Sequence, residues 1–151
     1  MSNPLQIFAV GGGGFTHPKD NYPQDAILED HLLALAGPIA KVKIGYIGHA
    51  SNDDPTKIGR FYKRFDGCAN LTALPLGANL AETTFFLNGL DILYVGGGST
   101  MEMLAYWQKT GIDKILIQSA HNGLILSGVS AGAICWFSEL LLGSAKDGYA
   151  L

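Results

Sequence analysis

The feature that most constrains this sequence is a recurring pattern in which a short apolar run passes directly into glycine. One run covers residues 5–10 and leads into the four glycines at 11–14, and another covers residues 91–95 and leads into the glycines at 96–98. A third run, at residues 124–128, ends at the sequence GVSAG. Strands that are apolar along their whole length are buried on both faces, as in parallel sheets covered by helices. The pattern therefore predicts an α/β protein with a mostly parallel sheet and helices on both faces.

The segments between these runs continue the alternation of strands and helices. Further strands are expected at residues 43–48 and 71–76, and residues 81–87 are expected to form a short helix or an irregular segment. Helical spacing of apolar side chains predicts the remaining helices, at residues 24–36, 56–65, 101–107, 112–121 and 131–142. With 151 residues and no linker or low-complexity stretch, the chain is expected to form one domain over residues 1–151.

Composition narrows the classes of partner. Only 15% of the residues are charged, against a typical value of about 25%, which favours burial of part of the surface in a homodimer. The net charge of -3 and the lack of a basic run argue against nucleic acid. No apolar stretch reaches the roughly 20 residues of a membrane span, so no membrane contact and a cytoplasmic location are expected. Cys68 and Cys135 do not have a metal-type spacing, so we expect reduced thiols, no metal and no cofactor.

The segment around Ser130 carries the clearest chemical signal. A serine flanked by glycines between a strand and a helix is typical of a nucleophile elbow, where side chains at Gly128 and Gly132 would collide with neighbouring elements. Such a turn exposes the hydroxyl and places the amide of Ala131, at the start of the helix, where it can stabilise an oxyanion. Gly98, in the glycine-rich turn after another strand, is the natural second donor. These positions predict Ser130 as a catalytic nucleophile.

Two motifs together resemble a known family. The run GGGST at residues 96–100, followed by GVSAGA at residues 128–133, is similar to the peptidase E group of serine peptidases, which includes aspartyl dipeptidase and the cyanophycinases. The run VGGG at residues 10–13 and the pair Ala50 and Ser51 agree with this resemblance, which covers nearly the whole chain. It implies a class I glutamine amidotransferase-like fold, which is a flavodoxin-like three-layer sandwich. It also implies a Ser-His-Asp/Glu site that releases N-terminal aspartate from small peptides.

The resemblance assigns roles by position. Ser130 matches the nucleophile, Gly98 and Ala131 match the oxyanion donors, and Asp147 matches the acidic partner, with Glu139 as the alternative. Ser99 departs from the family, which usually has asparagine there.

The histidine of the family is the larger departure. It lies after the acidic residue, and no histidine follows Ser130 here, so the C-terminal segment is expected to be lacking. His49 is the candidate substitute base because it follows a strand on the same edge, as does His17. His31 falls within the first helix, and His121 belongs to the opposite edge of the sheet.

Three functions follow from these observations. The favoured one is a serine-type dipeptidase acting on small peptides, with N-terminal Asp-Xaa as the expected substrate. The alternative is a truncated, inactive domain of the same fold that serves as a binding or assembly module. A nucleotide-binding, flavodoxin-like domain is disfavoured, because the glycine clusters have neither the Lys-Ser/Thr of a P-loop nor a full G-x-G-x-x-G.

Overall fold

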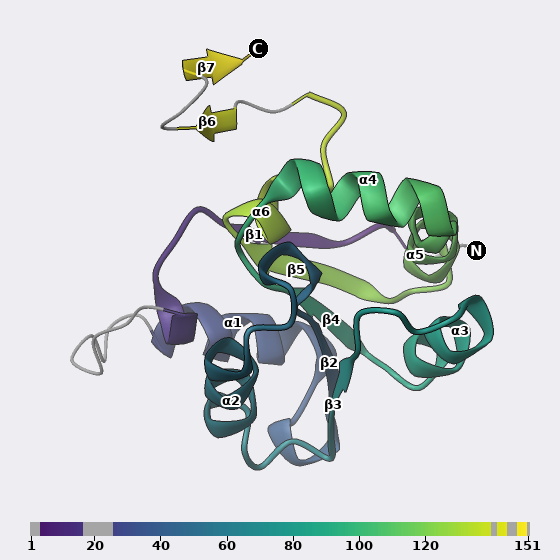
Figure 1. Ribbon diagram of the computed structural model, residues 1–151. Coiled ribbons are helices and arrows are strands. Elements are labelled where there is room, and N and C mark those ends of the chain that lie inside the picture. The colour runs from purple at the N-terminus through teal and green to yellow at the C-terminus, as the bar shows by residue number, and fades with distance from the viewer. Residues whose placement is uncertain (1–3, 17–25, 140–141, 145–147, 151) are drawn as a thin grey trace.

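The computed structural model describes residues 4–16, 26–139, 142–144 and 148–150, and its centre is a five-stranded sheet (Figure 1). The strands are β1 (Ile7–Val10), β2 (Lys43–Ile47), β3 (Asn70–Leu74), β4 (Ile92–Val95) and β5 (Ile125–Val129). All neighbouring strands are parallel, in the order β1-β5-β4-β2-β3. The predicted parallel sheet is confirmed, and each expected strand lies within two residues of its predicted bounds.

Helices cover both faces of the sheet. One face is covered by α1 (Ala26–Ala36) and α2 (Pro55–Arg64), and the other by α3 (Leu80–Asn88), α4 (Thr100–Thr110) and α5 (Ile112–His121). Short 3-10 turns within the described residues are η1 (Gly14–Thr16), η3 (Ile39–Lys41) and η4 (His49–Ser51). The predicted three-layer arrangement is therefore confirmed.

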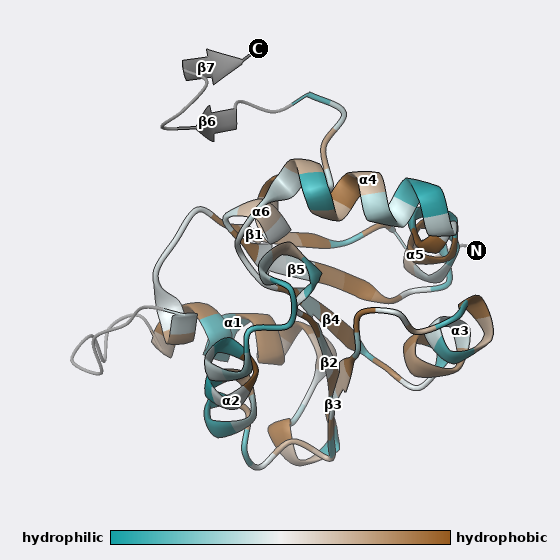
Figure 2. Ribbon diagram, in the orientation of Figure 1, coloured by the Kyte–Doolittle hydropathy of each residue, from teal (hydrophilic) through white to brown (hydrophobic). Residues whose placement is uncertain are grey.

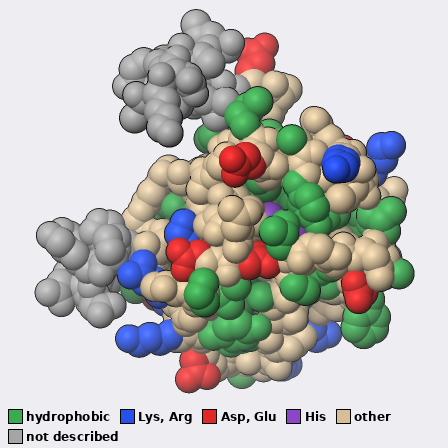
Figure 3. Space-filling view, viewed as in Figure 1, with side chains coloured by type: hydrophobic (Ala, Val, Ile, Leu, Met, Phe, Trp, Pro, Cys, Tyr) green, Lys and Arg blue, Asp and Glu red, His purple; other side chains and the backbone are tan. Residues whose placement is uncertain are grey.

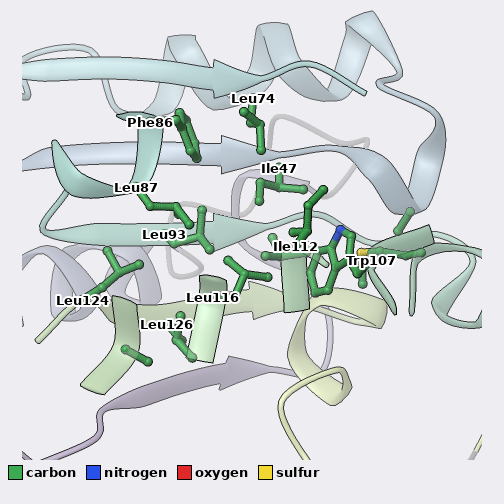
Figure 4. Close-up of a cluster of buried hydrophobic side chains, with 14 of the residues drawn as sticks. Ile47, Leu74, Phe86, Leu87, Leu93, Trp107, Ile112, Leu116, Leu124 and Leu126 are labelled. Atoms are coloured by element: carbon green, nitrogen blue, oxygen red, sulfur yellow. The ribbon is translucent and has the colours of Figure 1, made fainter. Parts of the chain in front are cut away.

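The strands are mainly apolar (Figure 2), because their alternate side chains enter two separate cores. In β4, Ile92 and Tyr94 pack against α1 and α2, whereas Leu93 and Val95 pack against α3, α4 and α5. The first core is rich in aromatic rings, with the centroids of Tyr46 and Phe61 5.1 Å apart. Figure 4 shows the second core, which lies around a buried Trp107 of α4.

The helices next to the carboxyl edge of the sheet have well-defined N-termini. Pro55 is the first residue of α2, and the Asp54 side chain before it accepts hydrogen bonds from the amides of Thr56 and Lys57, at 2.8 and 3.4 Å. Ser99 caps α4 by accepting from the amide of Glu102 at 3.3 Å. Side-chain caps of this kind satisfy amides that have no partner within the helix, and so fix where each helix begins.

The prediction of a helix over residues 131–142 is wrong, because the observed helix is much shorter. The observed α6 (Ala131–Ile134) has four residues and is followed by turns. The chain leaves the helix so that Trp136 packs against Trp107, with ring centroids 6.0 Å apart, while Phe137 stays 52% exposed. Further on, β6 (Leu142–Ser144) pairs antiparallel with β7 (Gly148–Ala150) in a separate two-stranded sheet. The apolar residues after Ser130 therefore do not form one continuous helical face.

Among the described residues, none of the helices combines the length and the apolar character needed to cross a membrane.

Candidate active site

The turns after β4 and β5 meet at the carboxyl edge of the sheet. Val95 at the end of β4 pairs with Gly128 of β5, and Val10 at the end of β1 pairs with Val129. This register brings the glycine turn after β4 next to Ser130. In open parallel sheets, ligands bind at this edge, outside the carboxyl ends of the strands.

Ser130 occupies a strained bend between β5 and α6. Its φ and ψ are 54° and -117°, a conformation that residues with a Cβ rarely adopt. The Ser130 amide donates to the carbonyl of Val10 at 3.0 Å, and the Ser130 carbonyl accepts from the amides of Ala133 and Ile134, at 2.9 and 3.0 Å. These bonds hold the backbone on both sides of the bend, and the residue itself is exposed. The expected elbow is present, while the role of Ser130 as nucleophile stays a prediction.

The two glycines that flank this bend are required by close packing. A Cβ added at Gly132 would overlap the main-chain carbonyl of Val95, and one added at Gly128 would lie 2.6 Å from the same oxygen. The sequence-based reason for glycine at both positions is therefore confirmed.

The glycine turn after β4 lies directly against Ser130. A Cβ added at Gly97 would be 3.2 Å from the Ser130 Cβ and 3.7 Å from its Oγ, so the bare backbone allows this approach. Gly98 has a φ of 151°, and a Cβ there would overlap the carbonyl of Ala50 in η4. Within the described part of the chain, the amides of Gly98 and Ala131 donate to no hydrogen-bond acceptor. Their assignment as oxyanion donors stays a prediction.

Three hydrogen bonds fix the glycine turn. The Gly96 amide donates to the carbonyl of Ile47 at 2.9 Å, and the Ser99 amide donates to the carbonyl of Ala50 at 2.7 Å. The third bond comes from the Lys57 ammonium, which donates to the carbonyl of Gly97 at 3.0 Å. Sequence reasoning missed Lys57, because it lies on a different helix 40 residues before its acceptor and belongs to no motif.

His49, the expected substitute base, is hydrogen-bonded to Trp107 and not to Ser130. It is 4% exposed, and its Nδ1 accepts a hydrogen bond from the Trp107 Nε1 at 3.0 Å. Burial lowers the pKa of His49, while the Asp53 carboxylate and the carbonyls of Leu74 and Pro75 act in the opposite direction. No hydrogen bond joins His49 to Ser130 in the described structure. This geometry does not favour His49 as the base, because its ring is held inside the core.

The other candidate residues are not brought to Ser130. Glu139 is exposed beyond α6 and forms no ion pair with any described residue. Asp147 and His17 lie outside the described residues. His31 is exposed on α1, and His121 is the last residue of α5, at the opposite edge of the sheet. Acidic and basic side chains are both present on the face shown in Figure 3, so neither sign of charge dominates it.

The parallel sheet and the bend at Ser130 define an α/β protein with a strained serine turn at the carboxyl edge of its sheet. The sequence model of peptidase family S51 matches residues 7–149. The chain therefore belongs to peptidase family S51, which confirms the resemblance to the peptidase E group.

Individual relatives agree with this assignment. The uncharacterized peptidase YgaJ of Bacillus subtilis is 35% identical over 145 residues, a match that covers 93% of this chain and 60% of the relative. The uncharacterized peptidase Lmo0363 of Listeria monocytogenes is 38% identical over 56 residues, which cover 37% of this chain and 27% of that protein. The chain thus spans less than two thirds of the length of these relatives.

Solved structures show the same fold. A Listeria monocytogenes protein assigned as a peptidase E matches with a TM-score of 0.55 and 25% identity, over 69% of this chain and 54% of that one. A peptidase from an acI-B1 Actinobacterium matches with a TM-score of 0.65 and 21% identity, over 85% of this chain and 55% of the other. These matches confirm the expected class I glutamine amidotransferase-like fold.

Proposed function

We propose that this chain carries the nucleophile and the oxyanion donors of a serine-type peptidase that acts on small peptides. The observation that carries the proposal is the exposed Ser130 in a strained elbow, with a φ of 54°. Backbone strain of about 1–3 kcal/mol persists in proteins where the surroundings enforce it, and such positions cluster at active sites. Membership of peptidase family S51 supports the same activity.

The proposed reaction begins with attack of the Ser130 Oγ on the carbonyl carbon of the substrate. The new C–O bond converts the carbonyl oxygen into an oxyanion, which accepts hydrogen bonds from the amides of Gly98 and Ala131. The hydroxyl proton passes to a base and then to the leaving amine as the C–N bond breaks, and water hydrolyses the acyl-enzyme. The family resemblance implies a histidine as this base, with Asp147 as its acidic partner and Glu139 as the alternative.

The preference for Asp-Xaa dipeptides is proposed on the resemblance to aspartyl dipeptidase. It is tested by incubating the protein with Asp-Xaa and Ala-Xaa dipeptides and measuring release of the free amino acid. Faster release from Asp-Xaa supports the preference, and equal or slower release contradicts it.

Labelling tests the nucleophile. A fluorophosphonate probe is expected to label the chain, Ser130→Ala should abolish labelling, and Ser138→Ala should leave it unchanged, because Ser138 is also exposed but lies outside the elbow. Labelling that persists in folded Ser130→Ala, or that is absent from the folded parent protein, would contradict the proposal.

A second candidate function is peptide binding without hydrolysis, by a domain that serves as a binding or assembly module. The hydrogen bond between His49 and Trp107 favours it, because it removes one candidate base from the site. In that case, calorimetry would detect dipeptide binding while no amino acid is released. Turnover that is lost in Ser130→Ala would exclude this function.

A further inference from the structure

We propose that Lys57 is a positioning residue that orients the oxyanion-donating amide of Gly98. The inference rests on the proposed function, since it concerns how one of the two oxyanion donors is held. Its starting point is the hydrogen bond of 3.0 Å from the Lys57 Nζ to the carbonyl oxygen of Gly97. This bond links α2 to the turn after β4. The same turn lies directly against Ser130.

The acceptor of this bond and the proposed oxyanion donor belong to one peptide group. The carbonyl of Gly97 and the amide of Gly98 share a planar peptide unit, and in a trans peptide the C=O and N–H bonds point in opposite directions. Fixing the oxygen therefore fixes the direction of the N–H. With Lys57 on the oxygen side, the Gly98 amide is directed away from α2.

The orientation of this peptide group must be fixed by a contact from another part of the chain, because the group joins the last two of three consecutive glycines. Glycine loses the most backbone freedom on folding and adopts positive φ without a Cβ penalty, so this peptide could otherwise rotate between orientations. The ends of the turn are fixed by the amides of Gly96 and Ser99, which donate to the carbonyls of Ile47, the last residue of β2, and of Ala50 in η4. Among the described residues, Lys57 is the group that hydrogen-bonds to the peptide between Gly97 and Gly98.

The charge of Lys57 adds to the effect of its position. A hydrogen bond from an ammonium is stronger than one between neutral groups. Polarisation of the carbonyl also makes the N–H of the same peptide a better donor, since hydrogen bonds in series strengthen one another. The lysine is half-buried, and its backbone is fixed by the Asp54 side chain, which accepts from its amide at 3.4 Å. The ammonium is therefore held against the carbonyl oxygen of this peptide.

The test compares three variants in dipeptide hydrolysis. Lys57→Met removes the charge and the donor while keeping similar length, Lys57→Arg keeps both, and Lys63→Met removes an exposed lysine from the same helix as a matched control. Loss of a whole oxyanion donor lowers kcat by about 100–1000-fold, so we expect misorientation in Lys57→Met to lower kcat by about 10–100-fold. KM should change by less than about 3-fold, because the interaction is made in the transition state. Lys57→Arg should recover most of kcat, and Lys63→Met all of it.

A second measurement needs no activity. In protein labelled with ¹⁵N-glycine, the Gly98 amide resonance should move in Lys57→Met, return towards its original position in Lys57→Arg, and stay in place in Lys63→Met. A Gly98 resonance that does not move in Lys57→Met would overturn the inference, whatever the activity.

The activity assay separates the two proposals. If Ser130→Ala is inactive while Lys57→Met keeps the parent kcat, the positioning role is wrong and the proposed nucleophile stands. If Ser130→Ala hydrolyses dipeptides as fast as the parent protein, the proposed function fails. The position of the Gly98 resonance then still decides whether Lys57 orients this peptide.

Discussion

Substitution of Gly132 by alanine is expected to destabilise this protein more than any ordinary surface change. The glycine lies in α6, directly behind the serine elbow and against the end of β4. A Cβ at this position would lie 2.9 Å from the Val95 Cβ and would overlap the Val95 carbonyl. Both obstacles belong to the central strand β4, whose Val95 is fully buried, so no flexible side chain can move aside.

The size of the effect follows from these contacts. Carbon atoms pack at about 3.5–4.0 Å, so α6 and β4 must separate by roughly 1 Å to admit the methyl group. Overpacking of this kind costs about 1–3 kcal/mol, and we expect the upper end, about 3 kcal/mol, because backbone must move. In a domain of this size each kcal/mol lowers Tm by about 2–4 °C, so the expected loss is about 6–12 °C.

Urea and thermal denaturation followed by circular dichroism measure this loss, with Gly59→Ala as the matched control. Gly59 lies in α2 with nothing within 4 Å of an added Cβ, so the same substitution there should stabilise by about 0.5–1 kcal/mol. The two variants add the same methyl group and differ in what surrounds it. A Gly132→Ala protein as stable as the parent would refute the close-packing argument for this elbow.

Three further substitutions test individual contacts by urea denaturation. Ser130→Gly should raise the free energy of unfolding by about 1 kcal/mol, because glycine tolerates the φ of 54°; an unchanged value would argue against strain. Trp107→Phe should lower it by about 1–3 kcal/mol, because the buried His49 loses its donor; equal stability would contradict that bond. Burial raises the pKa of Glu29 above 4.5, so the stability gained from its protonated form is present below 4.5 and lost as pH rises through the raised pKa. As the pH rises above 4.5, Glu29→Gln should therefore become more stable relative to the parent, and a stability difference that does not change with pH would contradict this.

The parallel sheet could be predicted from the sequence because its signals are local. Residues 91–95 are apolar without interruption, since alternate side chains of β4 enter different cores, and the glycines after them mark the end of the strand. The elbow at Ser130 was predictable for the same reason. Its flanking glycines are needed for contacts with β4, and that requirement is visible as a short motif. Both features are encoded within a few neighbouring residues.

The length of α6 and the state of His49 could not be predicted, because both depend on contacts between distant segments. Apolar residues at 134–137 favour a longer helix, yet packing of Trp136 against Trp107 of α4 ends it early. The sequence likewise places His49 after a strand on the correct edge, but the hydrogen bond from Trp107 holds it within the core. In both cases one tryptophan on another helix decides the outcome.

Lys57 extends this reasoning to the proposed catalytic site. The glycines at 96–98 indicate that the backbone must pass close to another group, but their freedom leaves the orientation of each peptide undetermined. The three bonds that orient the turn come from β2, η4 and α2, so the turn takes its shape from the tertiary structure. A glycine motif therefore predicts where an oxyanion could bind, whereas the residue that aims the amide is found only when the chain is folded. Because Lys57 lies on another helix and not in the glycine motif, Lys57→Met should lower kcat without altering any residue of the motif.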